Sequence, residues 1–375
     1  MGWSMRQLLI GPVLAASLLL AACVNSPAPM PTPTASPTPT ATPSPTTDPL
    51  TVGPVHPTST TTIATGLSAP WSIVRLDSGS TLISERDRGV VREVMADGQV
   101  RDVGAVPGVV PGGEGGLLGL EIIDGDLYTF FTSASDNRIV RFELDGSPGS
   151  YSLGAGTDIL TGLPKAGNHN GGRIKLGPDG MLYATAGDAA VPTNAQDPNS
   201  LGGKILRMTP DGAVPADNPF PGSYVYSLGH RNPQGITWDR DGQLWAAEFG
   251  QNTWDELNLI EAGGNYGWPV VEGQNPDAAY KSPVTQWSPA DASPSGLAWT
   301  RDTFFLAALR GERLWTIITD RGEVTPWFVG EFGRIRDVVP GPDGTVWMIT
   351  NNTAGKGTAR EGDDKLVQVS LEPVG

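Results

Sequence analysis

Two of the three histidines are possible proton acceptors, because they lie in polar, glycine-rich segments rather than in apolar runs. His169 lies in the segment 167–173 (GNHNGGR), and the apolar stretch that follows it ends at Asp188. If this stretch folds as a hairpin, Asp188 returns to the end of the sheet where His169 lies. A carboxylate bound to one imidazole nitrogen leaves the other nitrogen basic, as a general base requires. The alternative is a histidine that only forms hydrogen bonds within a turn.

Two further segments carry arginines that suit an anionic or carbonyl-rich ligand. The segment 229–235 (GHRNPQG) contains Arg231 and Asn232, which offer a guanidinium fork and an amide to a planar ligand. Arg334 and Arg336 are two residues apart, so on an extended segment their side chains point the same way. For this pair the alternative is a solvated strand edge.

Oxygen-bearing residues gather in a third region, at 248–256 (EFGQNTWDE) and 263–268 (GGNYGW). Carboxylates, amides and turn carbonyls are the ligands that calcium prefers, although the spacing is not that of an EF-hand and an ordinary polar loop is the alternative. The sequence contains no G-x-S-x-G elbow and no Walker or Rossmann glycine loop.

A repeated turn indicates the fold that positions these groups. An Asp-Gly turn followed by an apolar or aromatic strand start is typical of a β-hairpin. Close copies occur at 179–183, 241–245 and 343–347, looser ones at 77–82 and 124–128, and a variant without glycine at 300–305. Copies separated by roughly 40 to 60 residues predict an all-β, six-bladed β-propeller with four-stranded antiparallel blades around a central channel. A β-sandwich with coincidental hairpins is the alternative.

The placement of the polar segments relative to these turns predicts a single site. The segments around His169, Arg231 and Arg334 all lie just before a hairpin. In a propeller this places them at one end of the blades. We therefore expect a base, its carboxylate, several arginines and an oxygen-rich loop to meet at one mouth of the channel.

The N-terminal region predicts export. Arg6 and the apolar run Leu8–Leu20 precede Cys23, the only cysteine, in a pattern similar to the lipobox of bacterial lipoproteins. The pattern predicts a lipoprotein signal peptide at 1–22, lipidation at Cys23, a disordered Pro/Thr/Ser-rich tether at 23–57 and the propeller at 58–375. The protein would then be exported and anchored by lipid to the outer face of the bacterial cell membrane. An ordinary signal peptide with an incidental cysteine is the alternative.

The charge of the chain excludes one class of partner. The formal net charge is −15, and no basic stripe exists to neutralise phosphates. Nucleic-acid binding is therefore not expected.

Together these segments identify a resemblance to a known family. The chain resembles the soluble pyrroloquinoline quinone-dependent sugar dehydrogenases, the glucose/sorbosone and aldose sugar dehydrogenase family, over nearly the whole folded domain. The matching segments are 69–71 (APW), 84–86 (SER), 115–119 (GGLLG), 169–173 with 187–188, 229–235, 255–256 with 265–269 (NYGWP), and 334–337 (RIRD).

The resemblance implies catalytic roles for particular residues. His169 would remove the proton from the anomeric hydroxyl of an aldose sugar, with Asp188 orienting its ring. The anomeric hydride would pass to the quinone, giving a lactone. Arg231 and Asn232 would contact the quinone edge and the reacting sugar. Because no C-x-x-C-H haem motif is present, the electrons would leave to an external acceptor.

The resemblance also implies a cofactor and metal set. Arg334 and Arg336 would pair with the carboxylates of the quinone. The main-chain carbonyls of Gly250 and Gln251 would bind a calcium ion that polarises the quinone carbonyl as a Lewis acid. Residues matching positions that bind a second, structural calcium are Glu256 and Tyr266.

Two cofactor-binding positions depart from the family pattern. Glu114 stands where the family usually carries glutamine, and a carboxylate there would either repel the acids of the cofactor or be held by an arginine. Arg310 stands where a lysine is expected, which keeps the charge but changes reach and fork geometry. Two other functions remain open: a non-catalytic propeller that binds carbohydrate or a partner through an eroded site, and a calcium-dependent lactonase.

Overall fold

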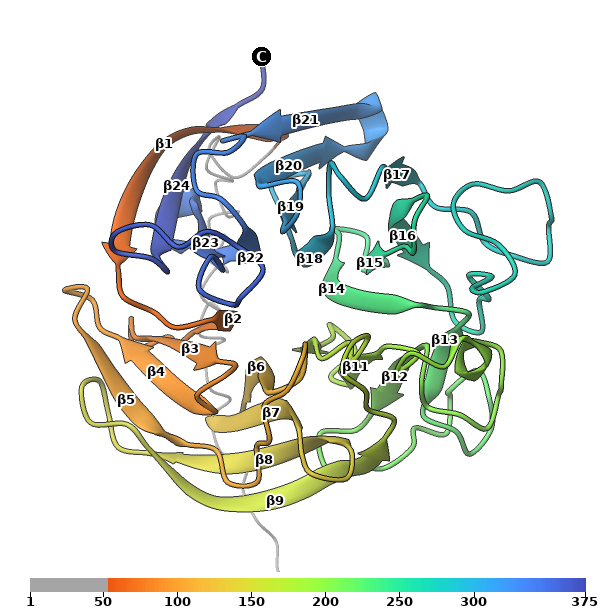
Figure 1. Cartoon of the computed structure of the whole chain (residues 1–375), viewed down its shortest axis with the longest axis horizontal. Helices are drawn as coiled ribbons and strands as arrows, with labels where there is room; N and C mark the ends of the chain where they lie inside the picture. The colour runs from red at the N-terminus through yellow and green to blue at the C-terminus, as the bar shows by residue number, and fades with distance from the viewer. Residues whose placement is uncertain (1–52) are drawn as a thin grey trace, which may run out of the picture. The chain divides into compact units, whose positions relative to one another are not determined.

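The computed structural model describes residues 53–375. The predicted signal peptide, the lipidation site Cys23 and most of the predicted tether lie outside the described residues. Residues 53–375 fold into twenty-four strands in six sheets of four antiparallel strands, which surround a central channel (Figure 1). The predicted six-bladed propeller is thus confirmed. No helix within this region has the length and apolar character needed to cross a membrane.

Five blades are each built from four consecutive strands, starting at the channel. The first contains β2 (Pro70–Arg75), β3 (Thr81–Glu85), β4 (Val90–Val94) and β5 (Val100–Ala105), and the second β6 (Leu117–Ile123), β7 (Asp126–Thr132), β8 (Asn137–Asp145) and β9 (Ser152–Leu163). The third contains β10 (Ile174–Leu176), β11 (Leu182–Ala186), β12 (Lys204–Met208) and β13 (Val225–Leu228). The fourth contains β14 (Asn232–Trp238), β15 (Leu244–Phe249), β16 (Asp255–Ile260) and β17 (Thr285–Trp287), and the fifth β18 (Pro294–Thr300), β19 (Thr303–Ala308), β20 (Arg313–Ile318) and β21 (Glu323–Trp327). Short 3-10 helices lie at η2 (Pro192–Ala195), η3 (Thr319–Arg321) and η4 (Pro342–Gly344).

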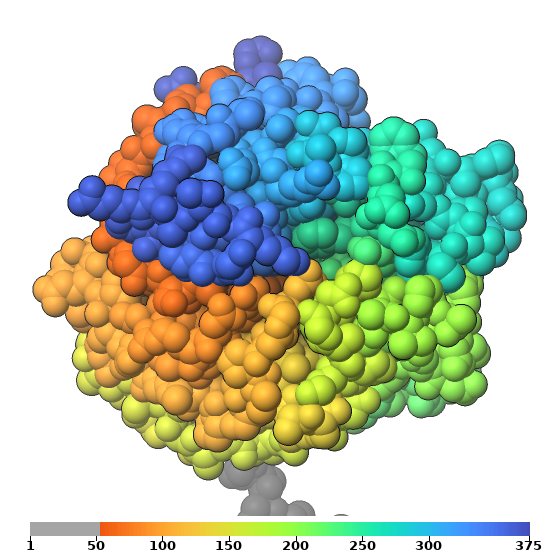
Figure 2. Space-filling model, viewed as in Figure 1, coloured from red at the N-terminus to blue at the C-terminus, as the bar shows by residue number. Residues whose placement is uncertain are grey.

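The sixth blade joins the two ends of the described chain. Its strands are β22 (Ile335–Pro340), β23 (Val346–Thr350), β24 (Leu366–Pro373) and, outermost, β1 (Val55–Ala64). In Figure 2 the orange N-terminal strand lies beside the blue C-terminal segment. Strand β1 begins at Val55, which is fully buried, pairs with Pro373 and donates its amide to Thr303 Oγ1 at 2.9 Å.

The predicted turns all occupy one topological position. Each connects the inner strand of a blade to its second strand. The backbone explains the variant without glycine, because Arg301 and Asp302 have φ angles of 47° and 57°, and the Asp343-Gly344 turn has 52° and 72°. Two successive left-handed residues are what a tight hairpin requires. The six turns lie at equivalent positions in six separate sheets, which excludes the alternative of a β-sandwich with coincidental hairpins.

Apolar side chains fill the space between neighbouring blades. One cluster joins Phe130 and Ile139 of the second blade to Leu182 and Leu206 of the third. Between the fourth and fifth blades the Trp245 ring packs against Phe304, with their centroids 4.7 Å apart. Close packing of this kind resists small displacements, so the ends of the inner strands are held in a fixed arrangement.

Candidate active site

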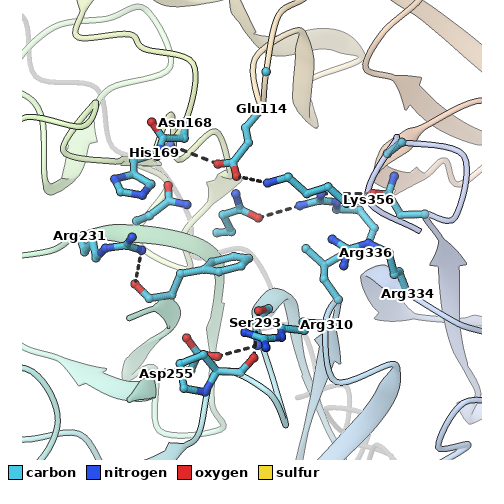
Figure 3. A pocket seen from close by; sticks show the side chains of 18 of the residues that line it. Glu114, Asn168, His169, Arg231, Asp255, Ser293, Arg310, Arg334, Arg336 and Lys356 are labelled. Atoms are coloured by element: carbon cyan, nitrogen blue, oxygen red, sulfur yellow. Dashed lines mark hydrogen bonds and ion pairs between the residues drawn. The ribbon is translucent and has the colours of Figure 1, made fainter. Parts of the chain in front are cut away.

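A cavity of about 530 Å³ opens where the inner strands begin (Figure 3). His169 precedes β10, Arg231 immediately precedes β14, and Arg334 and Arg336 lie at the start of β22; all four line the cavity. Residues at or just after the ends of the second strands also line the cavity: Phe249, Gly250, Gln251, Leu309, Arg310 and Asn351. The structure thus brings the segments that precede the hairpins into one pocket.

His169 is held by a buried carboxylate. Its Nδ1 lies 2.7 Å from Asp188 Oδ1, and the Asp188 side chain is fully buried. Asp188 also accepts hydrogen bonds from the Trp268 indole at 2.8 Å and from the Ala190 amide at 2.8 Å. An ionised Asp188 can only accept, so Nδ1 is the donor in this contact, and in the neutral ring Nε2 is the nitrogen with the free lone pair. The predicted contact between His169 and Asp188 is therefore present at the cavity wall, and the role of His169 as a base stays a prediction.

The arginine on the next blade is fixed by main-chain groups. Arg231 Nη1 donates to the Gly250 carbonyl at 2.6 Å, and its guanidinium lies 5.5 Å from the centre of the Trp268 ring. Its amide donates to Glu248, which also accepts from His230 Nδ1 at 2.7 Å. Burial lowers the pKa of Arg231. The charges of nearby carboxylates act to raise this pKa. Within residues 53–375, none of these carboxylates forms an ion pair with Arg231.

Asn232 lies next to this arginine, at the first position of β14. Its Oδ1 accepts a hydrogen bond from the Gly171 amide at 3.0 Å, which ties the fourth blade to the loop that carries His169. Asn232 also lines the cavity.

The opposite wall carries buried cations. Arg336 is 5% exposed and donates to Gln234 Oε1 at 2.8 Å, Ser295 Oγ at 3.2 Å and Asn351 Oδ1 at 3.2 Å, all uncharged acceptors. Burial lowers its pKa well below the ordinary value, and the like charges of neighbouring arginines lower it further. Burial also lowers the pKa of Arg334.

Three guanidinium donors of this pocket have no acceptor within residues 53–375. They are the buried Nε atoms of Arg231, Arg334 and Arg336. Buried charges are normally paired, because an unpaired one forfeits its hydration. The cavity therefore suits an anionic ligand with several acceptor oxygens.

Comparison with known proteins places this pocket in a family. The sequence profile described as Glucose / Sorbosone dehydrogenase matches residues 67–360. The chain belongs to this family. The resemblance stated from the motifs is thereby confirmed.

Individual relatives agree with this family assignment. The PQQ-bound form of an aldose sugar dehydrogenase from Streptomyces coelicolor is 47% identical, with a TM-score of 0.80 over 84% of this chain and 100% of that chain. An aldose sugar dehydrogenase of Escherichia coli is 28% identical over 340 residues, 77% of this chain and 89% of that protein. Quinoprotein glucose dehydrogenase B of Acinetobacter calcoaceticus is 33% identical over 258 residues, 58% of this chain. That match spans 54% of the Acinetobacter protein, about half its length.

The two positions that depart from the family pattern both line the cavity. Glu114 is held by a lysine rather than by an arginine: its Oε1 lies 2.7 Å from Lys356 Nζ, and its Oε2 accepts the His169 amide at 3.2 Å. Arg310 follows β19 and is exposed at the rim. The carboxylate is therefore charge-compensated within the pocket.

The residues expected to bind the first calcium lie on the same wall as Arg231. Gly250 and Gln251 both line the cavity. The Gly250 carbonyl accepts Arg231, but a carbonyl oxygen has two lone pairs and can bind a cation as well. Asp255 beside them accepts the amides of Gly250 and Ser293, and burial raises its pKa to about 6. This oxygen-rich corner fits a hard cation.

The residues expected to bind a second calcium lie elsewhere. Glu256 and Tyr266 line a narrow cleft behind the Gly250 loop, together with Glu248 and Glu272. Burial and the charge of Glu248 raise the pKa of Glu256 to about 7. In the part of the chain that the structure describes, no group of three or more His, Cys, Asp or Glu side chains is arranged to hold a metal ion. A second calcium at Glu256 and Tyr266 stays a prediction.

Sequence reasoning assigned no role to several residues that shape the pocket. Trp71 and Trp268 lay within the matched segments, and their rings pack beside Arg336 and Arg231 at 5.8 and 5.5 Å from the guanidinium carbons. Because Trp71 and Trp268 are aromatic residues within matched motifs, the sequence could have indicated that they contribute to the pocket. Lys356 lies in the connection between β23 and β24, where a lone lysine in a polar segment gives no signal.

Proposed function

We propose that the protein is a pyrroloquinoline quinone-dependent dehydrogenase that oxidises the C1 hydroxyl of aldose sugars to lactones. The observation that supports this most strongly is that His169 and the arginine pair Arg334 and Arg336 lie on opposite walls of the same cavity. A carboxylate-bound imidazole faces buried guanidinium groups that lack anionic partners. Family membership and the Streptomyces relative in its PQQ-bound form support the choice of quinone and substrate class.

In this proposal, Nε2 of His169 takes the proton of the anomeric hydroxyl while the C1–H bond breaks. Asp188 stabilises the imidazolium that forms and keeps the ring in position. The electron pair of the C1–H bond leaves as hydride, and the C1–O bond becomes the carbonyl of the lactone. Proton and hydride together account for the two electrons and two hydrogens that the sugar loses.

Arginines of the cavity wall hold the cofactor in this proposal. Arg334 and Arg336 bind its carboxylates, and the exposed Arg310 adds charge at the rim. Arg231 and Asn232 contact the quinone edge and the sugar oxygen. Gly250 and Gln251 offer carbonyl oxygens to a calcium ion. When bound, the quinone supplies the hydride acceptor and calcium the Lewis acid that polarises it.

The remaining parts of the proposal concern the setting of the enzyme. Glu256 and Tyr266 would bind a structural calcium. Acylation of Cys23 would anchor the exported propeller to the outer face of the bacterial cell membrane. Electrons would then pass to a separate acceptor outside the cell.

Reconstitution tests the proposed function. Purified protein with pyrroloquinoline quinone and calcium should bleach an artificial electron-acceptor dye when glucose is added. His169→Ala should abolish the bleaching, whereas His56→Ala, a matched change on the outer strand β1, should leave it intact. Failure of the wild-type protein to turn over any aldose, or equal activity of His169→Ala, would refute the proposal.

A further inference from the structure

Glu114 connects two loops and a distant lysine at the cavity wall (Figure 3). Its two carboxylate oxygens go to different partners: Oε2 accepts the backbone amide of His169 at 3.2 Å, and Oε1 accepts Lys356 Nζ at 2.7 Å. Its own amide donates to the Gly167 carbonyl at 2.8 Å. The loop that carries Glu114 therefore lies directly against the loop that carries the base.

The backbone of His169 needs such support. Its φ angle is 57°, in the left-handed region that non-glycine residues rarely adopt. A residue in this region keeps the conformation only when its surroundings enforce it. The ring is fixed by Asp188 and the carbonyl accepts the Ala189 amide at 3.1 Å. The amide is fixed by Glu114 alone.

Lys356 forms an ion pair with the Glu114 carboxylate. Burial acts to raise the pKa of Glu114, yet its pKa is lowered, because the hydrogen bond and charge of Lys356 and the His169 amide outweigh the burial. The Glu114 side chain is 28% exposed and that of Lys356 65%, so the pair lies at the rim and is partly screened. Without Lys356, its ion-pair partner, the Glu114 carboxylate would face the space that an anionic ligand enters.

We propose that Glu114 is a positioning residue with two separable roles: Oε2 fixes the backbone of the base His169, and the ion pair of Oε1 with Lys356 keeps the pocket receptive to an anionic cofactor. The second role rests on the proposed function, whereas the first is a property of the ligand-free protein. A glutamine at 114 can keep the first role, since its carbonyl can accept the amide. A glutamine cannot form an ion pair with Lys356. We therefore expect the carboxylate of Glu114 and the charge of Lys356 to depend on each other.

Four variants separate the two roles: Glu114→Ala removes both, Glu114→Gln and Lys356→Met each remove the ion pair, and the double variant Glu114→Gln/Lys356→Met removes both charges together. Histidine-labelled, ligand-free protein gives an amide NMR signal for each of the three histidines in the chain. Glu114→Ala should shift the His169 signal and leave His230 and His56 in place. Glu114→Gln should restore the His169 signal. An unchanged His169 signal in a folded Glu114→Ala protein would overturn the first role.

Turnover of the reconstituted enzyme gives a second readout for the base. A displaced general base lowers kcat, and misplacement of about 1 Å can cost about 100-fold. We expect Glu114→Ala to lower kcat by roughly 10- to 100-fold with little change in the KM for glucose. Glu114→Gln should recover most of this loss. Equal kcat values for Glu114→Ala and wild type would also contradict the first role.

Quinone titration by absorbance at low salt tests the ion pair. Lys356→Met removes the ion-pair partner of the Glu114 carboxylate and should weaken binding of pyrroloquinoline quinone by about tenfold, an interaction change of about 1.4 kcal/mol. The double variant should bind about as tightly as wild type. Equal affinities of Lys356→Met and the double variant would overturn the second role. If wild type itself binds no quinone, the proposed function fails, while the NMR result still decides the role toward His169.

Discussion

His169 and the arginine pair Arg334 and Arg336, on opposite walls of the pocket, differ in how fully residues 53–375 satisfy their polar groups. On the base side, the ring, amide and carbonyl of His169 each have a partner, and Asp188 accepts three hydrogen bonds. On the cation side, Arg334 and Arg336 keep unpaired Nε donors, and Arg336 has only uncharged acceptors. Figure 3 shows His169 and these two arginines at opposite sides of the cavity.

This difference indicates which part of the site is complete before any ligand binds. A general base must be oriented in advance, since its contribution depends on geometry at the moment of proton transfer. A cofactor site can instead leave its cations unpaired, because the ligand brings the missing anions. The cation side then gains most from binding, and ligand should stabilise the fold by mass action.

The largest expected effect tests the base side. Asp188→Asn preserves shape but removes the charge that holds Nδ1–H and stabilises the imidazolium. We expect turnover of the reconstituted enzyme to fall by about 100- to 10,000-fold, with quinone affinity nearly unchanged. Steady-state kinetics with a dye acceptor measure the first quantity, and absorbance titration the second. A parallel loss of both would remove the distinction between the two walls.

A somewhat smaller effect is expected on the cation side. Arg336→Met removes charge-assisted hydrogen bonds worth about 1.5–3 kcal/mol each, so quinone affinity should fall by about 100-fold. Arg310→Met, at the exposed rim, provides the control and should cost less, because an exposed charge contributes little. Equal losses in the two variants would show that burial of the cation does not determine binding.

The smallest expected effect concerns Glu256, a buried acid in the cleft behind the pocket, and is an effect on the stability of the fold. Burial raises the pKa of Glu256 from its ordinary 4.5 to about 7, so between these values the folded state holds a proton that the unfolded state has lost. The contribution of Glu256 to the stability of the calcium-free wild type should therefore decrease as the pH rises from 4.5 to 7. Glu256→Gln lacks this titration and should be more stable by on the order of 2 kcal/mol at alkaline pH.

Urea unfolding in the presence of a chelator measures this difference. The advantage of Glu256→Gln over wild type should be small in acid and reach its full size above pH 7. A difference that does not vary with pH would show that Glu256 does not titrate in this window.

The blades could be predicted from sequence because their signal is local. An Asp-Gly turn and the alternating strand behind it are read within a few residues, and even the variant at Arg301 and Asp302 adopts the same left-handed turn. The convergence of His169 and Arg231 followed from topology alone, since all inner strands begin at one end. The outer strand β1 has no such signal at its start, because the buried Val55 is embedded in a Pro/Thr-rich composition that hides its burial.

The contacts that complete the site could not be predicted, because they join distant segments. Lys356 and Glu114 are 242 positions apart, and Trp268 and Asp188 are 80 apart. Nothing in the neighbourhood of either partner indicates the other. The unpaired donors of the arginines likewise become visible only when burial and every nearby acceptor are known.

One titration tests the account most directly. Wild type, His169→Asn and Arg336→Met are titrated with pyrroloquinoline quinone in the presence of calcium, and the absorbance spectrum is recorded before and after glucose is added. We expect wild type to bind and to reduce the quinone, His169→Asn to bind with similar affinity without a spectral change on glucose, and Arg336→Met to bind about 100-fold more weakly. Equal loss of affinity in both variants, or no binding by wild type, would contradict the account.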